Sequence, residues 1–394
     1  MAVFLLFADS FAHYDTSFGL KWSSPGGAFE TDPAHIRTGP QSLRIQDGDS
    51  PSIVNFAYPT NVLNDVGQGP GPGGNVRFVT GFGWQTSSLA GETICELWAY
   101  WDIDGAVLLP VPLRQFFLVQ NANGSISVWT GNAGGETLIG TTSAGVLTVG
   151  PFWYIEFSVN MLTNELVLTV TGAANVATQV LIASGYTTTE NHADRFFWGG
   201  PSGLDSAWVS DFYLARWDGE APAVAGAPKI YGEVVPISPD GLGRLGASVS
   251  LAPFNETAAP FFSQVNELPQ DTADYIGRED VDGFFPFTMG QAFVYDVSSV
   301  PDGSEVFAVQ AVHMWSMGHD IDGNVPAPTP WAGVGGTGIN DYVFSQGKGG
   351  LVDSSFLFLT YPFDTNPVSG LPWSLDDFSG PDAMQIGPGV QSSG

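Results

Sequence analysis

The sequence contains very few basic residues. Lysine and arginine together number 11 against 40 aspartate and glutamate residues, which gives a formal charge of −29. The only lysines are Lys21, Lys229 and Lys348. Binding to a nucleic-acid backbone or to an anionic membrane requires basic patches. We therefore expect no nucleic-acid partner and no membrane insertion, and we expect the acidic surface to favour solubility.

Cysteine and long apolar runs are equally scarce. Cys95 is the single cysteine, so the chain cannot form an internal disulfide, and its position in ETICELWAY predicts a small buried hydrophobic residue. No run approaches the roughly 18 apolar residues of a transmembrane helix. The N-terminal MAVFLLFADSF lacks a basic region and a cleavage-site pattern, so we expect no signal peptide and synthesis in a cytoplasm.

Helical periodicity over ten or more residues is also absent, whereas short apolar and aromatic segments alternate with turns. Gly and Pro number 50 and 28, as expected for many short strands joined by tight turns. Asn123-Gly124 is the strongest hairpin signal. The predicted strands of the first half are 2–11, 42–45, 53–58, 76–84, 93–102, 114–121, 125–130, 136–140, 153–160, 165–171, 179–183, 195–198 and 208–215.

The stretch from Trp208 to Gly232 divides the chain. Its first half alternates as a strand covered on both sides, with Val209, Asp211, Tyr213 and Ala215 on one face. Its second half, APAVAGAPK, is typical of a connector. We predict an all-β chain with an antiparallel jelly roll over 1–217, a linker over 218–228, a smaller β-sandwich over 229–375 and a tail over 376–394. Strands of the second sandwich are expected at 292–297, 306–317, 342–346 and 356–361, and GPGVQSSG is typical of a loose terminus.

Both halves carry motifs of a known family. Asp9-Ser10-Phe11 followed by His13-Tyr14, ELWAYWDIDG, and the closing WVSDFYLARWDG resemble a concanavalin A-like (laminin-G-like) jelly roll, in the version that opens many tailed-phage virion proteins. The second half has VNELP at 265–269, followed by Asp271, Asp274 and Tyr275. That segment is similar to a phage virion β-module that follows such jelly rolls, although a "W-T-P" usual after its turn is replaced by SVSLAPFNET.

The resemblance implies a non-enzymatic structural protein on the surface of a phage virion, of the capsid-decoration, head-fibre or tail-fibre kind. It would act by assembly with other virion proteins and by attachment to a host-surface glycan. A homo-oligomer, by analogy a trimer, is expected, with edge strands and the aromatic LPWSLDDF segment as docking surfaces. The alternative is a glycan-binding adhesin or a polysaccharide-degrading enzyme of the same fold.

The residues themselves offer no catalytic motif. Glycosidases of this fold carry carboxylates at alternate positions of one strand, where an acid and a nucleophile can flank a sugar. Glu92 and Glu96 have the wrong spacing, and Asp102-x-Asp104 is one carboxylate short. No G-x-S-x-G, P-loop or Rossmann motif is present, and we predict no cofactor.

Candidates for binding remain. Asp320, Asp322 and Asn324 begin like a calcium loop, but Trp331 stands where an EF-hand has its last acidic ligand. Structural Ca²⁺ at this turn, or at the acidic cluster of Asp271, Asp274, Glu279, Asp280 and Asp282, is one alternative, and solvated turns are the other. His313 and His319, six residues apart, are a further metal candidate, against a structural or interface role. Aromatic rings near predicted loops could stack on sugars or belong to the core. These glycan-binding candidates are Trp84, Trp101 and Trp129, with Trp198 and Trp331.

Overall fold

The strands divide into two units. In the computed structural model, one unit contains every strand from β1 to β14, and the other contains every strand from β15 to β22. The protein is therefore all-β, as predicted. The structure describes residues 3–11, 27–47, 49, 53–55, 77–101, 108–132, 134–172, 177–188, 192–193, 195–200, 205–217, 234, 239–242, 288–290, 293–295, 297–298, 300, 303–315, 329–335, 342–344, 357–379 and 383–391. The predicted linker lies outside them.

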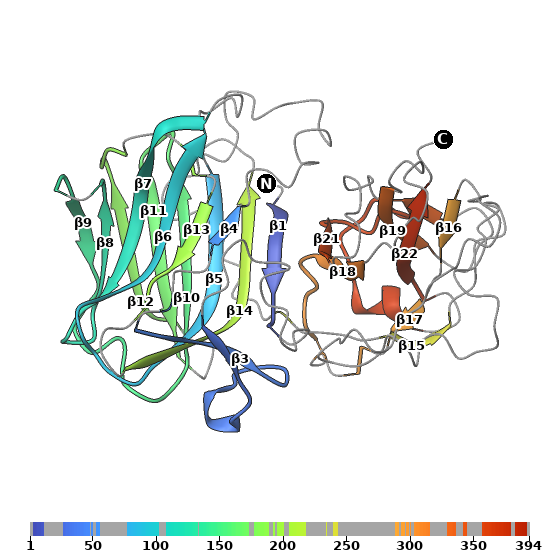
Figure 1. Cartoon of the computed structure of the whole chain (residues 1–394), viewed down its shortest axis with the longest axis horizontal. Helices are drawn as coiled ribbons and strands as arrows, with labels where there is room; N and C mark the ends of the chain where they lie inside the picture. Colours follow the sequence, from blue (N-terminus) through green and yellow to red (C-terminus); the bar gives the residue numbers. More distant parts are fainter. Residues whose placement is uncertain are drawn as a thin grey trace, which may run out of the picture. The chain divides into compact units, whose positions relative to one another are not determined.

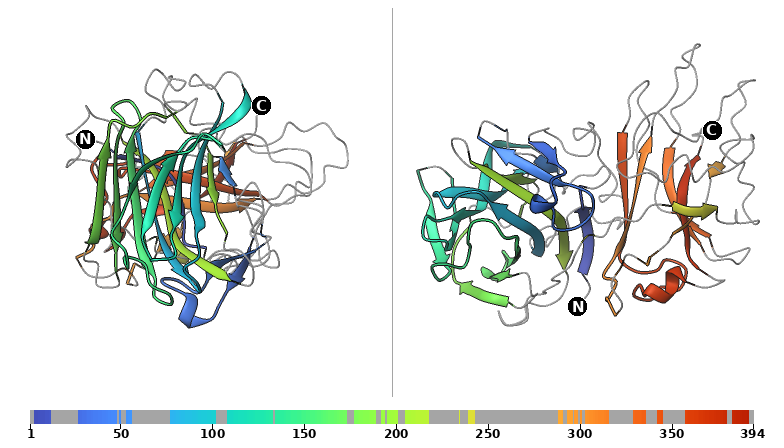
Figure 2. Two further views of the ribbon diagram at one scale, coloured as in Figure 1. Left: turned by 90° about the vertical axis from the view of Figure 1, so that its left-hand side faces the viewer. Right: turned by 90° about the horizontal axis from the view of Figure 1, so that it is seen from below.

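The first unit is a sandwich of two antiparallel sheets, drawn from blue to yellow-green in Figure 1. The first sheet has the order β12-β11-β10-β5-β14-β3-β2, with β1 paired to β14, and the second has the order β4-β13-β6-β7-β8-β9. Figure 2 shows the same strands from the side and from below. The strands are β1 (Val3–Asp9), β2 (Ala28–Glu30), β3 (Ser42–Gln46), β4 (Ile53–Asn55), β5 (Arg77–Thr86), β6 (Glu92–Trp101), β7 (Leu108–Gln120), β8 (Ile126–Thr130), β9 (Thr137–Thr141), β10 (Trp153–Asn160), β11 (Glu165–Thr171), β12 (Ala177–Ser184), β13 (Arg195–Trp198) and β14 (Ser206–Trp217).

Aromatic rings hold the two sheets together. Phe82 of the first sheet meets Trp198 of the second edge-on, with ring centroids 4.8 Å apart, and Phe116 meets Phe157 at 5.6 Å. All four side chains are fully buried, and each such burial contributes about 1.5–3 kcal/mol. Cys95 lies in the same core, as predicted. Burial raises the pKa of its thiol far above the usual range.

Turn chemistry at two sequence motifs fixes strand ends. Asp9 Oδ1 accepts a hydrogen bond from the Phe11 amide at 2.7 Å, and Phe11 has a positive φ of 61°. This Asp-Ser-Phe turn ends β1 and buries the Phe11 ring completely. At the predicted Asn-Gly hairpin, Gly124 has a φ of 75° and its amide donates to Asn121 O at 2.8 Å. The hairpin between β7 and β8 is confirmed.

The strand β14 departs from regular alternation. Val209 pairs with Trp84 and Leu214 pairs with Thr80, two residues on the same face of β5. Val209 and Leu214 therefore both face the core, although residues an odd number of positions apart face opposite ways in a regular strand. The register shifts between Ser210 and Tyr213, where Asp211 has a φ of 54°. The bulge moves the second half of the strand to the opposite face. The predicted strand is confirmed, but the predicted division of its faces is wrong.

The second unit contains a six-stranded sheet of order β15-β17-β22-β19-β20, with β16 on β22, and a two-stranded sheet of β18 and β21. Its strands are β15 (Pro239–Leu242), β16 (Thr288–Gly290), β17 (Phe293–Tyr295), β18 (Val309–Trp315), β19 (Thr329–Gly335), β20 (Tyr342–Phe344), β21 (Leu357–Phe363) and β22 (Gln385–Gln391). The loose terminus expected for GPGVQSSG is wrong for Gly387–Gln391, because these residues belong to β22, which pairs with β16, β17 and β19.

Among the described residues, the core of the second unit includes a segment that was predicted to dock elsewhere. Trp373 is 4% exposed, packs with Tyr361 and Ile386, and donates through Nε1 to the Phe363 carbonyl at 2.8 Å. The following 3-10 turn η6 (Leu375–Phe378) begins with a Ser374–Asp377 capping box. The ring expected to serve as a docking surface is therefore part of this unit's own core.

Candidate functional site: an aromatic face on the second sheet

Trp84, predicted as a glycan-binding residue, belongs to the core. Its side chain is 2% exposed, and its Nε1 donates to Gln120 Oε1 at 3.1 Å. Trp198 is completely buried beside Phe82. A sugar cannot stack on a ring that lies between the two sheets, so the structure contradicts both candidates. Trp84 and Trp198 are inaccessible because the inward-facing aromatic residues of β5 and β13 pack between the two sheets and hold the sandwich together.

Several other candidates cannot be located in this way. Asp320, Asp322 and Asn324, and the acidic cluster between Asp271 and Asp282, lie outside the described residues. Trp101 ends β6 and Trp331 lies in β19, but the structure does not describe either side chain. Among the residues that are described, no three His, Cys, Asp or Glu side chains gather in a way that could hold a metal ion. The calcium site stays a prediction.

Trp129 lies on the outer face of the second sheet. In β8 it is the one residue that is only half-buried, because its neighbours Val128 and Thr130 point toward the first sheet. Trp129 pairs across the sheet with Phe117 of β7, and the two rings stack at 6.1 Å with an interplanar angle of 15°. The predicted Trp129 is thus at the surface, where a ligand can reach it.

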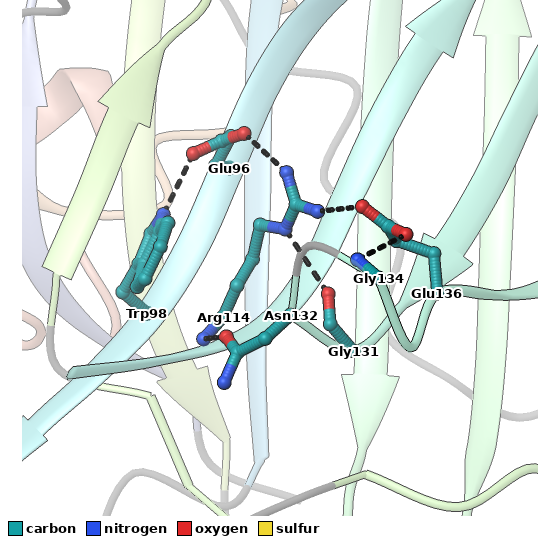
Figure 3. A network of polar contacts seen from close by, with 7 residues as sticks. All are labelled: Glu96, Trp98, Arg114, Gly131, Asn132, Gly134 and Glu136. Carbon is teal, nitrogen blue, oxygen red and sulfur yellow. Dashed lines mark hydrogen bonds and ion pairs between the residues drawn. The ribbon is translucent and has the colours of Figure 1, made fainter. Parts of the chain in front are cut away.

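Arg114 forms the centre of this face (Figure 3). Its Nη1 donates to Glu96 Oε1 at 2.8 Å and its Nη2 to Glu136 Oε1 at 2.9 Å. Its Nε donates to the Gly131 carbonyl at 3.1 Å, and its backbone amide donates to Asn132 Oδ1 at 2.7 Å. One guanidinium therefore connects β6 and β7 to the loop between β8 and β9.

The same guanidinium covers aromatic rings. Its central carbon lies 3.7 Å from the centroid of Phe117 and 6.0 Å from that of Trp98. Phe117 is 7% exposed beneath it. Cation–π contacts and bidentate pairing suit arginine because its planar group can stack and donate at once. Arg114 is therefore held in one position by both its rings and its carboxylates.

Glu96 and Glu136 are both held in place by further hydrogen bonds. Glu96 Oε2 also accepts a hydrogen bond from Trp98 Nε1 at 2.8 Å, which orients the indole. Two backbone amides, of Glu136 itself and of Gly134, lower the pKa of Glu136, and Arg114 lowers it further. The Gly134 amide donates to Glu136 Oε2 at 3.0 Å. Both side chains keep solvent access, at 20% and 32% exposed.

A second group of rings continues the face toward β13. Trp98, Tyr100 and Phe197 surround one another with centroids 5.8 to 6.2 Å apart. The guanidinium carbon of Arg195 lies 4.0 Å from the Tyr100 centroid. Each of these side chains is half-buried. We call Trp98, Tyr100, Trp129 and Phe197, with Arg114 between them, the aromatic face.

The arrangement is suited to binding a ligand that has apolar faces and polar edges. Half-exposed rings supply flat apolar area, and they lose little side-chain freedom on binding because they are already packed. Ionised carboxylates next to them accept hydrogen bonds and can still take further donors. A pyranose ring presents C–H groups on its faces and hydroxyls around its edge, which matches this combination.

The first sheet carries a different polar cluster, and it is buried. Asp211 is completely buried and is engaged by Arg37 and Thr38. Glu156 is 2% exposed and accepts a hydrogen bond from the Tyr213 hydroxyl at 2.7 Å. Burial, together with Tyr154 and Glu156, raises the pKa of Tyr213 well above its usual range. These groups stabilise the sheet and do not form an open site.

Sequence reasoning missed most of the aromatic face. Of its members it identified Trp129 alone, because Trp98, Tyr100 and Phe197 look like ordinary strand residues. A usable signal was present in β6, where Glu96, Trp98 and Tyr100 occupy alternate positions and therefore one face of a strand. The role of Arg114 has no local signal, since its carboxylate partners are 18 and 22 residues away.

These features define the class of the first unit as an antiparallel β-sandwich of the jelly-roll type. No family model and no curated protein matches the sequence. Among solved structures, the carbohydrate esterase vb_24B_21 from the Shiga toxin-encoding bacteriophage phi24B is 14% identical, with a TM-score of 0.35, and the match covers 54% of this chain and 99% of that one.

Two further solved structures are similar to about half of the chain. Lectin II from Ulex europaeus is 11% identical over 54% of this chain and 98% of that one, with a TM-score of 0.33. The receptor-binding domain of botulinum neurotoxin type G is 10% identical over 54% of this chain and 47% of that one, with a TM-score of 0.31. Identities this low leave the functional argument to the residues themselves. No helix among the described residues is long and apolar enough to cross a membrane.

Proposed function

We propose that this chain is a non-enzymatic surface protein of a tailed-phage virion that attaches to a host-surface glycan through the aromatic face. The observation that carries the attachment is the set of half-exposed rings held around Arg114, with its guanidinium 3.7 Å from Phe117 and bonded to Glu96 and Glu136. Rings fixed in this way offer a pre-formed stacking surface, so binding costs little ordering.

Four described carboxylates of the first unit support binding without hydrolysis. A glycosidase needs one carboxyl with a raised pKa as the acid and a second as base or nucleophile. On the aromatic face, the pKa of Glu136 is lowered, and Glu96 is bonded to Arg114 and Trp98. On the first sheet, Glu156 and Asp211 are buried and engaged.

The virion assignment rests on sequence. The segment with Asp9-Ser10-Phe11 and His13-Tyr14 resembles the opening of a phage jelly roll, and VNELP with Asp271, Asp274 and Tyr275 resembles the virion module that follows such jelly rolls. The charge of −29 suits a protein displayed in many copies. Other virion proteins and copies of this chain, by analogy in a trimer, are the expected partners.

The attachment is tested by titrating polysaccharides onto purified full-length protein by calorimetry. Trp129→Ala and Trp98→Ala should each weaken binding at least tenfold, an effect of about 1.4 kcal/mol, within the range for losing one aromatic stack. Ile182→Ala removes a 52% exposed side chain from the first sheet and should leave binding unchanged. Equal affinity for the wild type and all three variants would contradict attachment through this face.

Two further measurements separate the other parts of the proposal. Release of new reducing ends from a bound polysaccharide would overturn the non-enzymatic assignment. Immunogold labelling of phage particles should place the protein at regular positions on the virion. Labelling absent from particles would overturn the virion assignment while leaving glycan attachment to be judged by calorimetry alone.

A further inference from the structure

The charges of the aromatic face bear on which class of glycan it binds, and this inference rests on the proposed attachment function. Recognition of an anionic sugar requires a cation whose charge is available to the ligand. Arg114 does not meet this requirement, because carboxylates lie 2.8 and 2.9 Å from its two terminal nitrogens. The Arg114 side chain is 12% exposed, and its single positive charge is outnumbered by the two carboxylates that it joins.

The second cation of the face is Arg195, and it is directed toward a ring. Its guanidinium carbon lies 4.0 Å from the centroid of Tyr100, and the side chain is half-buried. The two positive charges of Arg114 and Arg195 balance the two negative charges of Glu96 and Glu136. Among the described residues that build the face, these four charged groups therefore leave no net charge.

The field of the whole chain opposes anions as well. A formal charge of −29 repels an approaching polyanion and lowers its association rate. At physiological salt the screening length is about 8 Å, so the repulsion acts before the polyanion touches the protein surface. A local attraction strong enough to overcome it would need an uncompensated cationic cluster, and Arg114 and Arg195 do not form one.

We propose that the aromatic face binds an uncharged oligosaccharide segment that lies across β13, β6, β7 and β8. Adjacent strands lie about 4.8 Å apart, so Phe197 at one side and Trp129 at the other are separated by about 14 Å, which requires several sugar units. The rings stack on the sugar faces. Sugar hydroxyls donate to the acceptor positions that Glu96 and Glu136 retain, since an ionised carboxylate offers about four.

The test compares uncharged and anionic polysaccharides of matched length on the full chain. The probes are dextran, mannan and galactan on one side, and alginate, hyaluronate and polysialic acid on the other. Calorimetry is run at about 0.15 M and about 1 M salt, where the screening lengths are about 8 and 3 Å. At least one uncharged polymer should bind, with an affinity that changes less than threefold between the two salt concentrations.

Each outcome decides something different. Binding of an anionic polymer that weakens at high salt would overturn the inference and leave glycan attachment intact. Binding of no polymer by protein that is folded and decorates the particle would overturn the attachment function and this inference with it. Salt-insensitive binding of an uncharged polymer, blocked by oligosaccharides of several units but not by the monosaccharide, is the expected result.

A charge variant sharpens the comparison. Glu96→Gln keeps an acceptor oxygen but leaves Arg114 with one carboxylate, so affinity for the uncharged polymer should fall about tenfold, as for loss of a hydrogen bond to a charged group. Anionic polymers should bind this variant better than the wild type. Glu30→Gln, which removes the Arg44 ion pair of the first sheet at 3.5 Å, is the matched control and should change neither. Unchanged binding of both polymer classes by Glu96→Gln would contradict the role given to its charge.

Discussion

The Tyr213 hydroxyl donates a hydrogen bond of 2.7 Å to Glu156 Oε2, although their strands do not pair with each other. Both residues pair with Gly81 of the intervening strand β5. A side chain at position 81 would occupy the path of this bond. The glycine therefore allows β10 and β14 to interact directly across a third strand.

Gly81→Ala should destabilise the jelly roll. The added Cβ would lie 2.3 Å from Tyr213 Cε1 and 2.6 Å from Tyr154 Oη, and forcing these buried rings aside costs about 1–3 kcal/mol. Chemical denaturation followed by tryptophan fluorescence measures the loss. Gly91→Ala is the control, because its Cβ would meet nothing within 4 Å. Equal midpoints for the two variants would contradict this packing argument.

Asp211→Asn should be strongly destabilising although asparagine accepts a positive φ. The substitution deprives Arg37, whose side chain is 15% exposed, of a fully buried carboxylate. Breaking a buried pair in this way costs about 3–5 kcal/mol. Asp211→Ala should cost about 1 kcal/mol more, because alanine tolerates the left-handed backbone poorly. Glu30→Gln, at a more exposed ion pair, should cost less than about 1 kcal/mol. A wild-type denaturation midpoint for Asp211→Asn would rule out a stabilising role for the charge.

Cys95 should be inert in the folded protein. It is completely buried, and burial, with a smaller effect from Glu96, raises its thiol pKa, so the reactive thiolate is almost absent. With a thiol reagent at neutral pH, native protein should react at least 100-fold more slowly than protein in denaturant. Since the chain has one cysteine, the signal reports the jelly roll alone. Rapid labelling of native protein would show that the core around β6 opens readily.

His313 should make the second unit sensitive to mild acid. Burial of its ring nitrogens lowers its pKa from 6.5 to about 3. Between these values the unfolded chain binds the proton and the folded chain does not. Stability is therefore complete above pH 6.5 and falls by about 1.4 kcal/mol per pH unit below it.

The measurement is denaturation of wild type and His313→Gln from pH 7 to pH 4. Glutamine does not titrate, so the difference in unfolding free energy between the two proteins should shrink as the pH falls. A difference that is constant over this range would contradict a neutral histidine with buried ring nitrogens.

Regular strands could be predicted from the sequence because one face of each is apolar. The segments 153–160, 165–171 and 195–198 match β10, β11 and β13 residue for residue. Prediction was less complete at β7, which begins at Leu108 rather than at Arg114. Pro110 and Pro112 argue against a strand at the start of β7, because proline cannot donate a ladder hydrogen bond. The two prolines are tolerated because the pairing of β8 with β7 is confined to Phe116–Gln120. Strand β8 therefore accepts no hydrogen bond at Pro110 or Pro112, which lack a backbone N–H.

Long-range relations explain the remaining errors. The bulge at Asp211 is stabilised by Arg37, which is 174 residues away in the sequence. The local alternation of β14 therefore does not predict the bulge. The strand Gln385–Gln391 contains two glycines and a proline, and it forms a strand only because partners lie on both sides of it. For the aromatic face, the sequence could show that Trp129 is aromatic but not which tryptophans face outward.

The pairing of β1 with β14 has a consequence for how such domains are exchanged. Val3 is the register partner of Trp217, so the two ends of the jelly roll lie on neighbouring strands, about 5 Å apart. A domain whose entry and exit adjoin can be inserted into a different protein, or removed from this one, with little disturbance of the chain on either side. The residues of the aromatic face all lie between Val3 and Trp217, so an exchange made at these two neighbouring ends would carry the whole set of rings together.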